Sequence, residues 1–224
     1  MSRLISLQHS VEFADNPEPR CPCVLLLDTS QSMTGAPIDE LNRGLAAFRD
    51  DIVQDSLAAR RVEVAIVTFG GQVLVAQDFV TADEFDPPTL MPRGQTPLGG
   101  AVLRGLDLIE SRKVEYRRHG IEYYRPWCFL ITDGKPQGEA PRVLEDAAAR
   151  VLAEDAAKRI AFFSVGVQGA DMVKLDRLSL RKPMPLKGLN FVNMFLWLSR
   201  STQAVSQSRI GMQEPLPSVD WSTA

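Results

Sequence analysis

The sequence predicts an α/β fold with three layers, built on a doubly wound, mainly parallel six-stranded sheet that has one antiparallel edge strand. Short continuous apolar runs such as residues 23–27 are typical of strands that are buried on both faces. These runs alternate with longer segments whose apolar residues recur every three or four positions, as in helices that cover a sheet. The pair Gly70-Gly71 joins two strand patterns and indicates a hairpin, so the strand after it should run antiparallel at an edge.

Local signals place each element in order. The first strand stops at Asp28 and a polar turn follows, after which Pro37 suits the first turn of a helix. The stretch 81–95 contains three prolines and is expected to be a loop. Thr96 and the proline after it begin the second helix. The segment 112–125, which includes His119, is strongly polar and is expected to be a helix end and an exposed loop.

These signals predict six strands and five helices. The strands are expected at residues 23–27, 62–69, 72–79, 127–132, 160–167 and 185–189. The helices are expected at residues 37–52, 97–109, 141–152, 172–180 and 191–208. No linker or repeat interrupts them, so we expect an N-terminal extension (1–20), one domain (21–208) and a flexible C-terminal tail (209–224).

Composition narrows the class of function. The chain has 25 Lys and Arg against 28 Asp and Glu, a net charge of −3, which argues against binding nucleic acid or an anionic membrane through bulk electrostatics. No apolar run approaches the roughly 20 residues that span a bilayer, and the N-terminus is a poor secretory signal. The three cysteines suggest no disulfide framework, so we expect a cytoplasmic protein. Cys23 and Cys128 are expected to be small buried apolar residues.

Three polar turns carry the chemistry. Asp28, Ser30 and Ser32 follow the first strand directly, and Asp133 follows the strand 127–132. Thr96 lies at the start of a helix. In open α/β sheets, ligands bind beyond the carboxyl ends of the strands, where these turns can meet. Two carboxylates and three hydroxyls form an all-oxygen set of the kind that Mg²⁺ prefers. Each turn alone is more often a plain turn or a helix cap, and only their combination predicts a metal site.

The segments VLLLDTSQSM, GQTPLGGAV and FLITDGKP resemble the three segments of the metal-ion-dependent adhesion site (MIDAS) of von Willebrand factor type A domains. The likeness is greatest to the bacterial, tellurite-resistance-associated TerY and YegL-like group. It implies that the hydroxyls of Ser30, Ser32 and Thr96 bind Mg²⁺ (or Mn²⁺ or Ca²⁺) directly. Asp28 and Asp133 would then act through water. The resemblance further implies a partner protein that presents Asp or Glu to the metal, such as a kinase or phosphatase of the same gene cluster. Gln31 departs from the glycine that is frequent there, without removing a ligand.

Catalysis is the less favoured interpretation. A metal-dependent phosphatase or hydrolase using Asp28 remains the alternative. A dehalogenase-like phosphatase would need a second Asp at the position that Ser30 occupies. A Ser-His-Asp hydrolase needs a histidine near the strand ends, and neither His9 nor His119 follows a buried strand. We therefore expect an interaction module and no enzyme.

Overall fold

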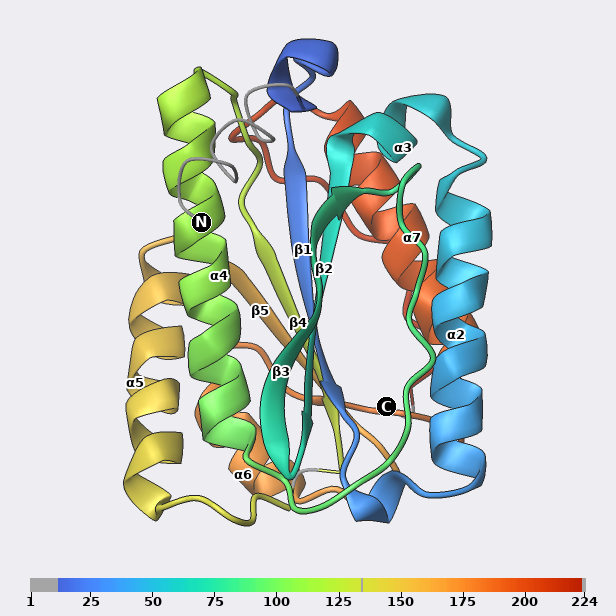
Figure 1. Ribbon diagram of the computed structural model, residues 1–224, viewed down its shortest axis with the longest axis vertical. Helices are drawn as coiled ribbons and strands as arrows, with labels where there is room; N and C mark the ends of the chain where they lie inside the picture. The colour runs from blue at the N-terminus through green and yellow to red at the C-terminus, as the bar shows by residue number, and fades with distance from the viewer. Residues whose placement is uncertain (1–11, 134, 223–224) are drawn as a thin grey trace.

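The computed structural model describes residues 12–133 and 135–222, which form a single six-stranded sheet with the strand order β3-β2-β1-β4-β5-β6 (Figure 1). The strands are β1 (Cys21–Asp28), β2 (Val62–Gly70), β3 (Gln72–Thr81), β4 (Trp127–Thr132), β5 (Ala161–Gly166) and β6 (Met184–Pro185). The helices are η1 (Gln31–Met33), α2 (Ala36–Ile52), α3 (Ser56–Arg61), α4 (Leu98–His119), α5 (Pro141–Ala156), α6 (Met172–Leu178) and α7 (Phe191–Gln207).

The predicted fold class is confirmed. All neighbouring strands are parallel except β2 and β3, which pair antiparallel through the Gly70-Gly71 turn. Helices α2 and α7 cover one face of the sheet, and α4 and α5 cover the other (Figure 1). Strand β1 lies centrally and pairs with both β2 and β4, so its carboxyl end adjoins the carboxyl end of β4.

The central strand is buried on both sides, as its continuous apolar run predicts. Leu25 and Leu27 belong to the core shared with α2 and α7. Val24 and Leu26 belong to the core shared with α4 and α5. Successive side chains of a strand point to opposite faces, so a strand covered by helices on both faces needs apolar residues at every position.

Two elements differ from the expectation. Helix α3 has no strong apolar period and was not predicted; Asp55 caps it by accepting hydrogen bonds from two backbone amides. Helix α4 runs to His119, so the helix end expected in residues 112–125 is present, but several of its polar residues are buried, which was not expected. Arg112 is buried because Glu63 of β2 accepts hydrogen bonds from it, at 2.9 Å from Nε and 2.7 Å from Nη2. His119 is the last residue of that helix and its ring packs on Phe13.

The C-terminal segment, for which the sequence predicts a flexible tail, packs against the domain at several points where the structure describes it. Trp221 is fully buried, its ring centroid 5.6 Å from that of Trp197 in α7. Trp197 Nε1 donates to the carbonyl of Pro217 at 2.9 Å, and Leu186 forms a β-bridge with Ser222. At the other end, residues 12–20 of the predicted extension also pack on the domain, while 1–11, 134, 223 and 224 lie outside the described residues.

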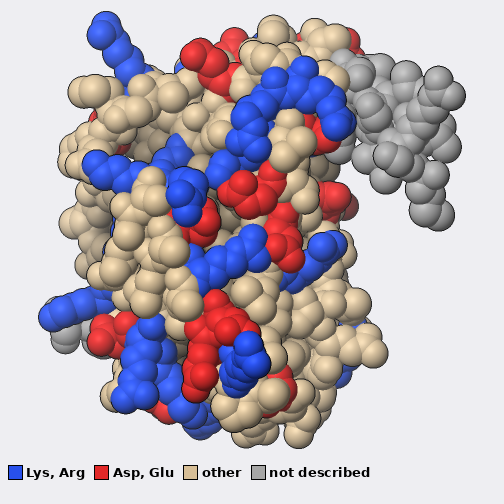
Figure 2. All heavy atoms as spheres, turned by 90° about the vertical axis from the view of Figure 1, so that its left-hand side faces the viewer, with Lys and Arg blue, Asp and Glu red and all other residues tan. Residues whose placement is uncertain are grey.

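The outer surface of α4 and α5 carries intermixed charges (Figure 2). Arg150 pairs with Asp107 across the two helices, and Lys113 pairs with Glu110 within α4. Such alternation of sign gives this face no extended basic or acidic field. None of the helices in residues 12–133 and 135–222 has the length and apolar content to cross a bilayer.

Candidate metal centre

The structure brings the three predicted turns together at one edge of the sheet. Because Leu27 of β1 is paired in register with Ile131 of β4, the residues that follow them, Asp28 and Thr132, end their strands side by side. Backbone hydrogen bonds join the turns. The amide of Gln31 donates to the carbonyl of Gly94 at 3.0 Å, and the amide of Gln137 donates to that of Thr96 at 2.9 Å.

Two glycines let these loops approach closely. A Cβ at Gly70 would lie 2.2 Å from the carbonyl oxygen of Thr29. Gly94 has φ +62°, and a Cβ there would lie 2.6 Å from the Cα of Gly71. A side chain at Gly70 would push the end of β2 away from the turn after β1, and a side chain at Gly94 would push the proline-rich loop away from the turn between β2 and β3.

The first turn holds its side chains in a defined arrangement. Asp28 is fully buried; its Oδ1 accepts from the amide of Ser30 at 2.8 Å and its Oδ2 accepts from Thr132 Oγ1 at 2.6 Å. The hydroxyl oxygens of Ser30 and Ser32 lie 2.9 Å apart. Adjacent ligands of an octahedral Mg²⁺, each at about 2.1 Å from the ion, lie about 3 Å apart. The serine pair therefore has the spacing of two neighbouring ligands of one ion.

Electrostatics favour a cation here. Burial raises the pKa of the Asp28 carboxyl, and the nearby charge of Asp133 raises it as well, while hydrogen bonds from Ser30 and Thr132 lower it. The groups with the largest effects on the pKa of Asp28 include no Lys, Arg or His. A divalent cation would compensate both carboxylates.

The other two predicted ligands, Thr96 and Asp133, are also buried. Thr96 is buried, and its Oγ1 makes no hydrogen bond within residues 12–133 and 135–222. It is not the helix cap either, since Pro97 occupies the cap position of α4. Asp133 is 5% exposed, and its Oδ1 accepts from the amide of Lys135 at 3.2 Å. Ser32 and Asp133 face a shared pocket of about 320 Å³, which Lys135 also lines.

The donor set decides which metal fits. Nowhere in the described parts of the chain do three or more His, Cys, Asp or Glu side chains gather into a metal-binding group. The turns offer carboxylate and hydroxyl oxygens alone, which suit a hard cation and lack the ligands that zinc prefers in structural sites. The residues present therefore fit Mg²⁺ or Mn²⁺.

Sequence reasoning missed two supporting residues. Thr132 donates to Asp28, and its only sequence signal is its place beside Asp133 at the end of the neighbouring strand. Glu139 accepts hydrogen bonds from the amides of Gly99 at 2.7 Å and Gly100 at 3.0 Å. These bonds join the start of α4, which follows Thr96, to the loop that follows Asp133. A carboxylate at a helix N-terminus is favoured by the helix dipole.

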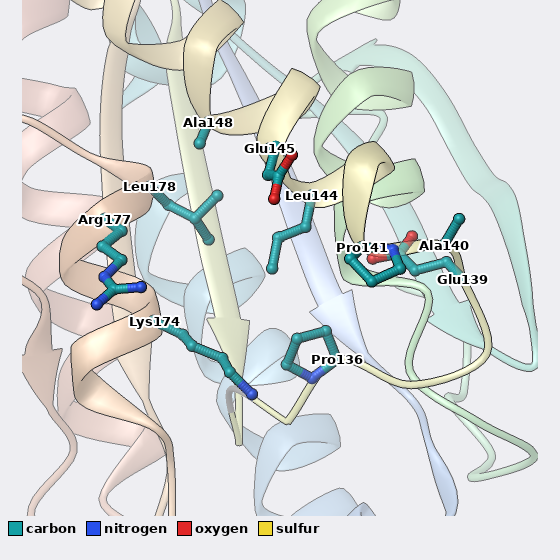
Figure 3. Close-up of a pocket in the computed structure, with 10 residues that line it drawn as sticks. All are labelled: Pro136, Glu139, Ala140, Pro141, Leu144, Glu145, Ala148, Lys174, Arg177 and Leu178. Atoms are coloured by element: carbon teal, nitrogen blue, oxygen red, sulfur yellow. The ribbon is translucent and has the colours of Figure 1, made fainter.

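A groove of about 390 Å³ lies between α5 and α6, beside the loop that follows Asp133 (Figure 3). Leu144 and Leu178 form its apolar floor, with Glu145 on the α5 side and Lys174 and Arg177 on the α6 side. None of these side chains belongs to the predicted ligand set.

The cysteines take no part in the site. Cys21, Cys23 and Cys128 are buried free thiols, as expected for the last two. Burial raises the pKa of Cys21 to about 12, with a further contribution from the charge of Glu63. A thiol that stays protonated at neutral pH is a poor nucleophile and a poor metal ligand.

The chain thus combines a doubly wound, mainly parallel sheet with oxygen-rich turns at the carboxyl ends of its central strands. The chain belongs to the von Willebrand factor type A domain family, which matches residues 23–192. No curated protein matches the chain.

Solved structures of the same fold are distant in sequence. The von Willebrand factor domain of the type V pili tip protein Mfa5 from Porphyromonas gingivalis is 10% identical, with a TM-score of 0.61 and coverage of 86% of this chain and 98% of that one. Proximal thread matrix protein 1 from the mussel byssus, with a zinc-occupied MIDAS motif, is 14% identical, with a TM-score of 0.55 and coverage of 83% and 48%. Manganese-loaded TRAP protein from Plasmodium vivax is 17% identical, with a TM-score of 0.54 and coverage of 80% and 73%. The chain spans about half the length of the mussel protein, and identities this low show the fold alone.

Proposed function

We propose that this protein is a metal-dependent protein–protein interaction module. Mg²⁺, or in its place Mn²⁺ or Ca²⁺, would be held by Asp28, Ser30, Ser32, Thr96 and Asp133. The observation that carries the proposal is the pair of serine hydroxyls 2.9 Å apart beside a buried carboxylate. Membership of the von Willebrand factor type A family supports it.

The ligand set determines what the site would bind. When bound, the cation supplies a positive charge that attracts an anionic oxygen. Ser30, Ser32 and Thr96 would hold it through neutral hydroxyls, which donate little charge to the ion, so its open position favours an anionic oxygen. Asp28 is fixed by its two hydrogen bonds and orients the serine turn. Asp or Glu of a partner protein is the matching group, and the pocket lined by Ser32 and Asp133 gives it access.

The cellular setting rests on the resemblance of the three segments to the TerY and YegL-like group. By that resemblance, the partner is a kinase or phosphatase of a bacterial stress or tellurite-resistance complex in the cytoplasm. The related structures hold zinc in the mussel protein and manganese in the Plasmodium protein, so the cation in this chain must be measured.

The geometry does not favour the hydrolase alternative. Both oxygens of Asp28 accept hydrogen bonds, and the carboxylate is fully buried, which is unfavourable for a nucleophile. His119 ends α4, whereas the metal centre adjoins the start of that helix, so it cannot serve as a base there. Accordingly, we propose a binding protein and no enzyme.

The test compares two hydroxyl deletions in the same turn. Calorimetric titration with Mg²⁺ and Mn²⁺ should show binding to the wild type, a loss of about tenfold or more in Ser32→Ala, and none detectable in Asp28→Ala. Thr34→Ala is the matched control, because Thr34 carries an exposed hydroxyl whose hydrogen bonds within the described residues are all to Gln31. Unchanged metal binding in Asp28→Ala refutes the site.

The interaction itself is tested by pull-down. A partner should be retained by the wild type and by Thr34→Ala, and released by EDTA or by Ser32→Ala. Hydrolysis of a generic phosphate ester that depends on Asp28 would instead support the enzyme alternative.

A further inference from the structure

A second cavity, of about 630 Å³, lies at the opposite end of the sheet from the metal centre. It opens where β4 and β5 begin, whereas the metal turns follow the ends of β1 and β4. Trp127 and Phe163 give it an aromatic wall, with their ring centroids 4.8 Å apart. Val205 of α7 and Leu216 of the C-terminal segment add further apolar surface. We call it the basal cavity.

Basic side chains outnumber acidic ones around the basal cavity. Arg125, Lys158 and Arg181 line it. Arg125 and Arg181 share a single buried carboxylate, that of Asp155, which also accepts from the amide of Phe162 at 3.1 Å. Asp155 does not line the cavity itself, and among the described residues the acid that does is Glu214. Counting both, three cations face two carboxylates.

Arg125 and Arg181 each have N–H groups that make no hydrogen bond within the described residues. Arg181 bonds to Asp155 and to the carbonyl of Phe162 through Nη1, and within the described residues its Nε and Nη2 have no acceptor. Arg125 uses Nε and Nη2, which leaves Nη1 without one in the same part of the chain. The Arg181 guanidinium stacks over Phe163 at 5.0 Å from the ring centroid, which orients it beside the aromatic wall.

Lys158 contributes a backbone conformation that few residues adopt. It has φ 57°, the sole positive φ of a residue other than glycine in the described chain. A glycine would take this conformation with less strain, yet the position holds a lysine at the rim of a basic cavity.

Burial lowers the pKa of Arg125, and the charge of Arg181 lowers it further, although Asp155 raises it. One carboxylate, that of Asp155, thus pairs with both guanidiniums.

We propose that the basal cavity binds a small amphipathic organic anion. Its acidic group would accept hydrogen bonds from the donors of Arg181 and Arg125, with Lys158 adding charge at the rim. Its aromatic or aliphatic body would lie on Trp127 and Phe163. This site is separate from the metal centre and needs no metal.

Anilinonaphthalene sulfonate is a suitable probe, because it is an aromatic anion, and phenylnaphthylamine is its uncharged counterpart. The full chain should bind one equivalent of the sulfonate in EDTA, with energy transfer that falls in Trp127→Phe. Arg181→Gln should weaken binding about tenfold or more. Arg159→Gln is the matched control, since Arg159 lies nearby in sequence, pairs with Glu154 and does not line the cavity.

Lys158→Gly guards against misfolding, because glycine relieves the strained backbone while removing the charge. It should weaken sulfonate binding several-fold without lowering the unfolding temperature. The proposal is overturned if Arg181→Gln and Lys158→Gly bind as tightly as the wild type, or if phenylnaphthylamine binds as well as the sulfonate. Loss of binding in Asp28→Asn would place the sulfonate at the metal centre and would also overturn it.

Discussion

At the scale of single residues, the ionised form of Asp28 that metal binding requires is the form that lowers the stability of the metal-free protein. Its carboxylate is fully buried, and burial is the largest cause that raises its pKa. A raised pKa means that the folded, metal-free protein holds the Asp28 proton more tightly than the unfolded chain does. Hence ionised Asp28 costs stability at neutral pH, and that cost shrinks as the pH falls through the raised folded-state pKa toward the lower unfolded-state pKa.

We expect Asp28→Asn to stabilise the metal-free protein at neutral pH. The amide keeps an acceptor for the Ser30 amide and carries no charge, so unfolding should cost about 1 kcal/mol more, or about 2–4 °C in midpoint. Thermal unfolding in EDTA measures this. The exposed Asp86→Asn is the control and should change little. A lower midpoint for Asp28→Asn would show that the ionised carboxylate is stabilising instead.

Thr132 sets the pH dependence of metal binding through Asp28. The metal requires the ionised carboxylate, so Mg²⁺ affinity should fall as the pH falls through the raised pKa. The hydrogen bond from Thr132 lowers that pKa, and Thr132→Val removes it, so the pKa of Asp28 should rise further. As the pH is lowered, Thr132→Val should therefore begin to lose Mg²⁺ affinity at a higher pH than the wild type does. Thr132→Ser retains the hydroxyl and should behave as the wild type. Titrations at several pH values check this, and identical profiles for the Val and Ser variants would contradict it.

At the scale of elements, α4 shows where local sequence patterns stop being informative. From their charge alone, Arg112 and Lys113 are expected at the solvent-exposed end of a helix, yet both are buried. The reason lies in another strand: Glu63 of β2 accepts from Arg112, from Tyr116 and from Arg20, at 2.8 Å for the Arg20 Nε. Buried charges are tolerated when they are paired, and a partner 49 residues away cannot be read from local polarity.

Glu63→Gln should destabilise the domain strongly. It removes the carboxylate that compensates two buried guanidiniums, a change that costs about 3–5 kcal/mol at comparable sites. Urea unfolding measures it. Glu12→Gln is the control because Glu12 contacts Arg112 from a partly exposed position and should cost less than about 1 kcal/mol. Equal effects of the two variants would show that Glu63 is not central to this network.

At the scale of the whole molecule, the mainly parallel sheet, its antiparallel edge strand and both helical layers could be predicted, because continuous apolar runs, apolar stripes and the Gly70-Gly71 turn are visible in the sequence. The order of the strands in the sheet could not be predicted in this way. The Asp28 and Asp133 turns could be located, because strand ends follow from the apolar runs. The C-terminal packing could not. Only one large aromatic residue, Trp221, follows α7, and nothing near it in sequence predicts the contact with Trp197.

Trp221 therefore tests whether the C-terminal segment is part of the fold. Trp221→Ala should destabilise the protein by about 3–5 kcal/mol, since it empties a site that is fully buried against Trp197. Met212→Ala, at an exposed position in the same segment, should cost less than about 0.5 kcal/mol. The backbone carbonyl of Trp221 accepts a hydrogen bond from the amide of Lys187 at 3.0 Å, and the packing of the Trp221 ring against α7 holds that carbonyl in place. Trp221→Ala should therefore also speed hydrogen exchange at residues 185–187. If the Trp221 and Met212 variants unfold at the same denaturant concentration, the segment does not contribute to the stability of the domain.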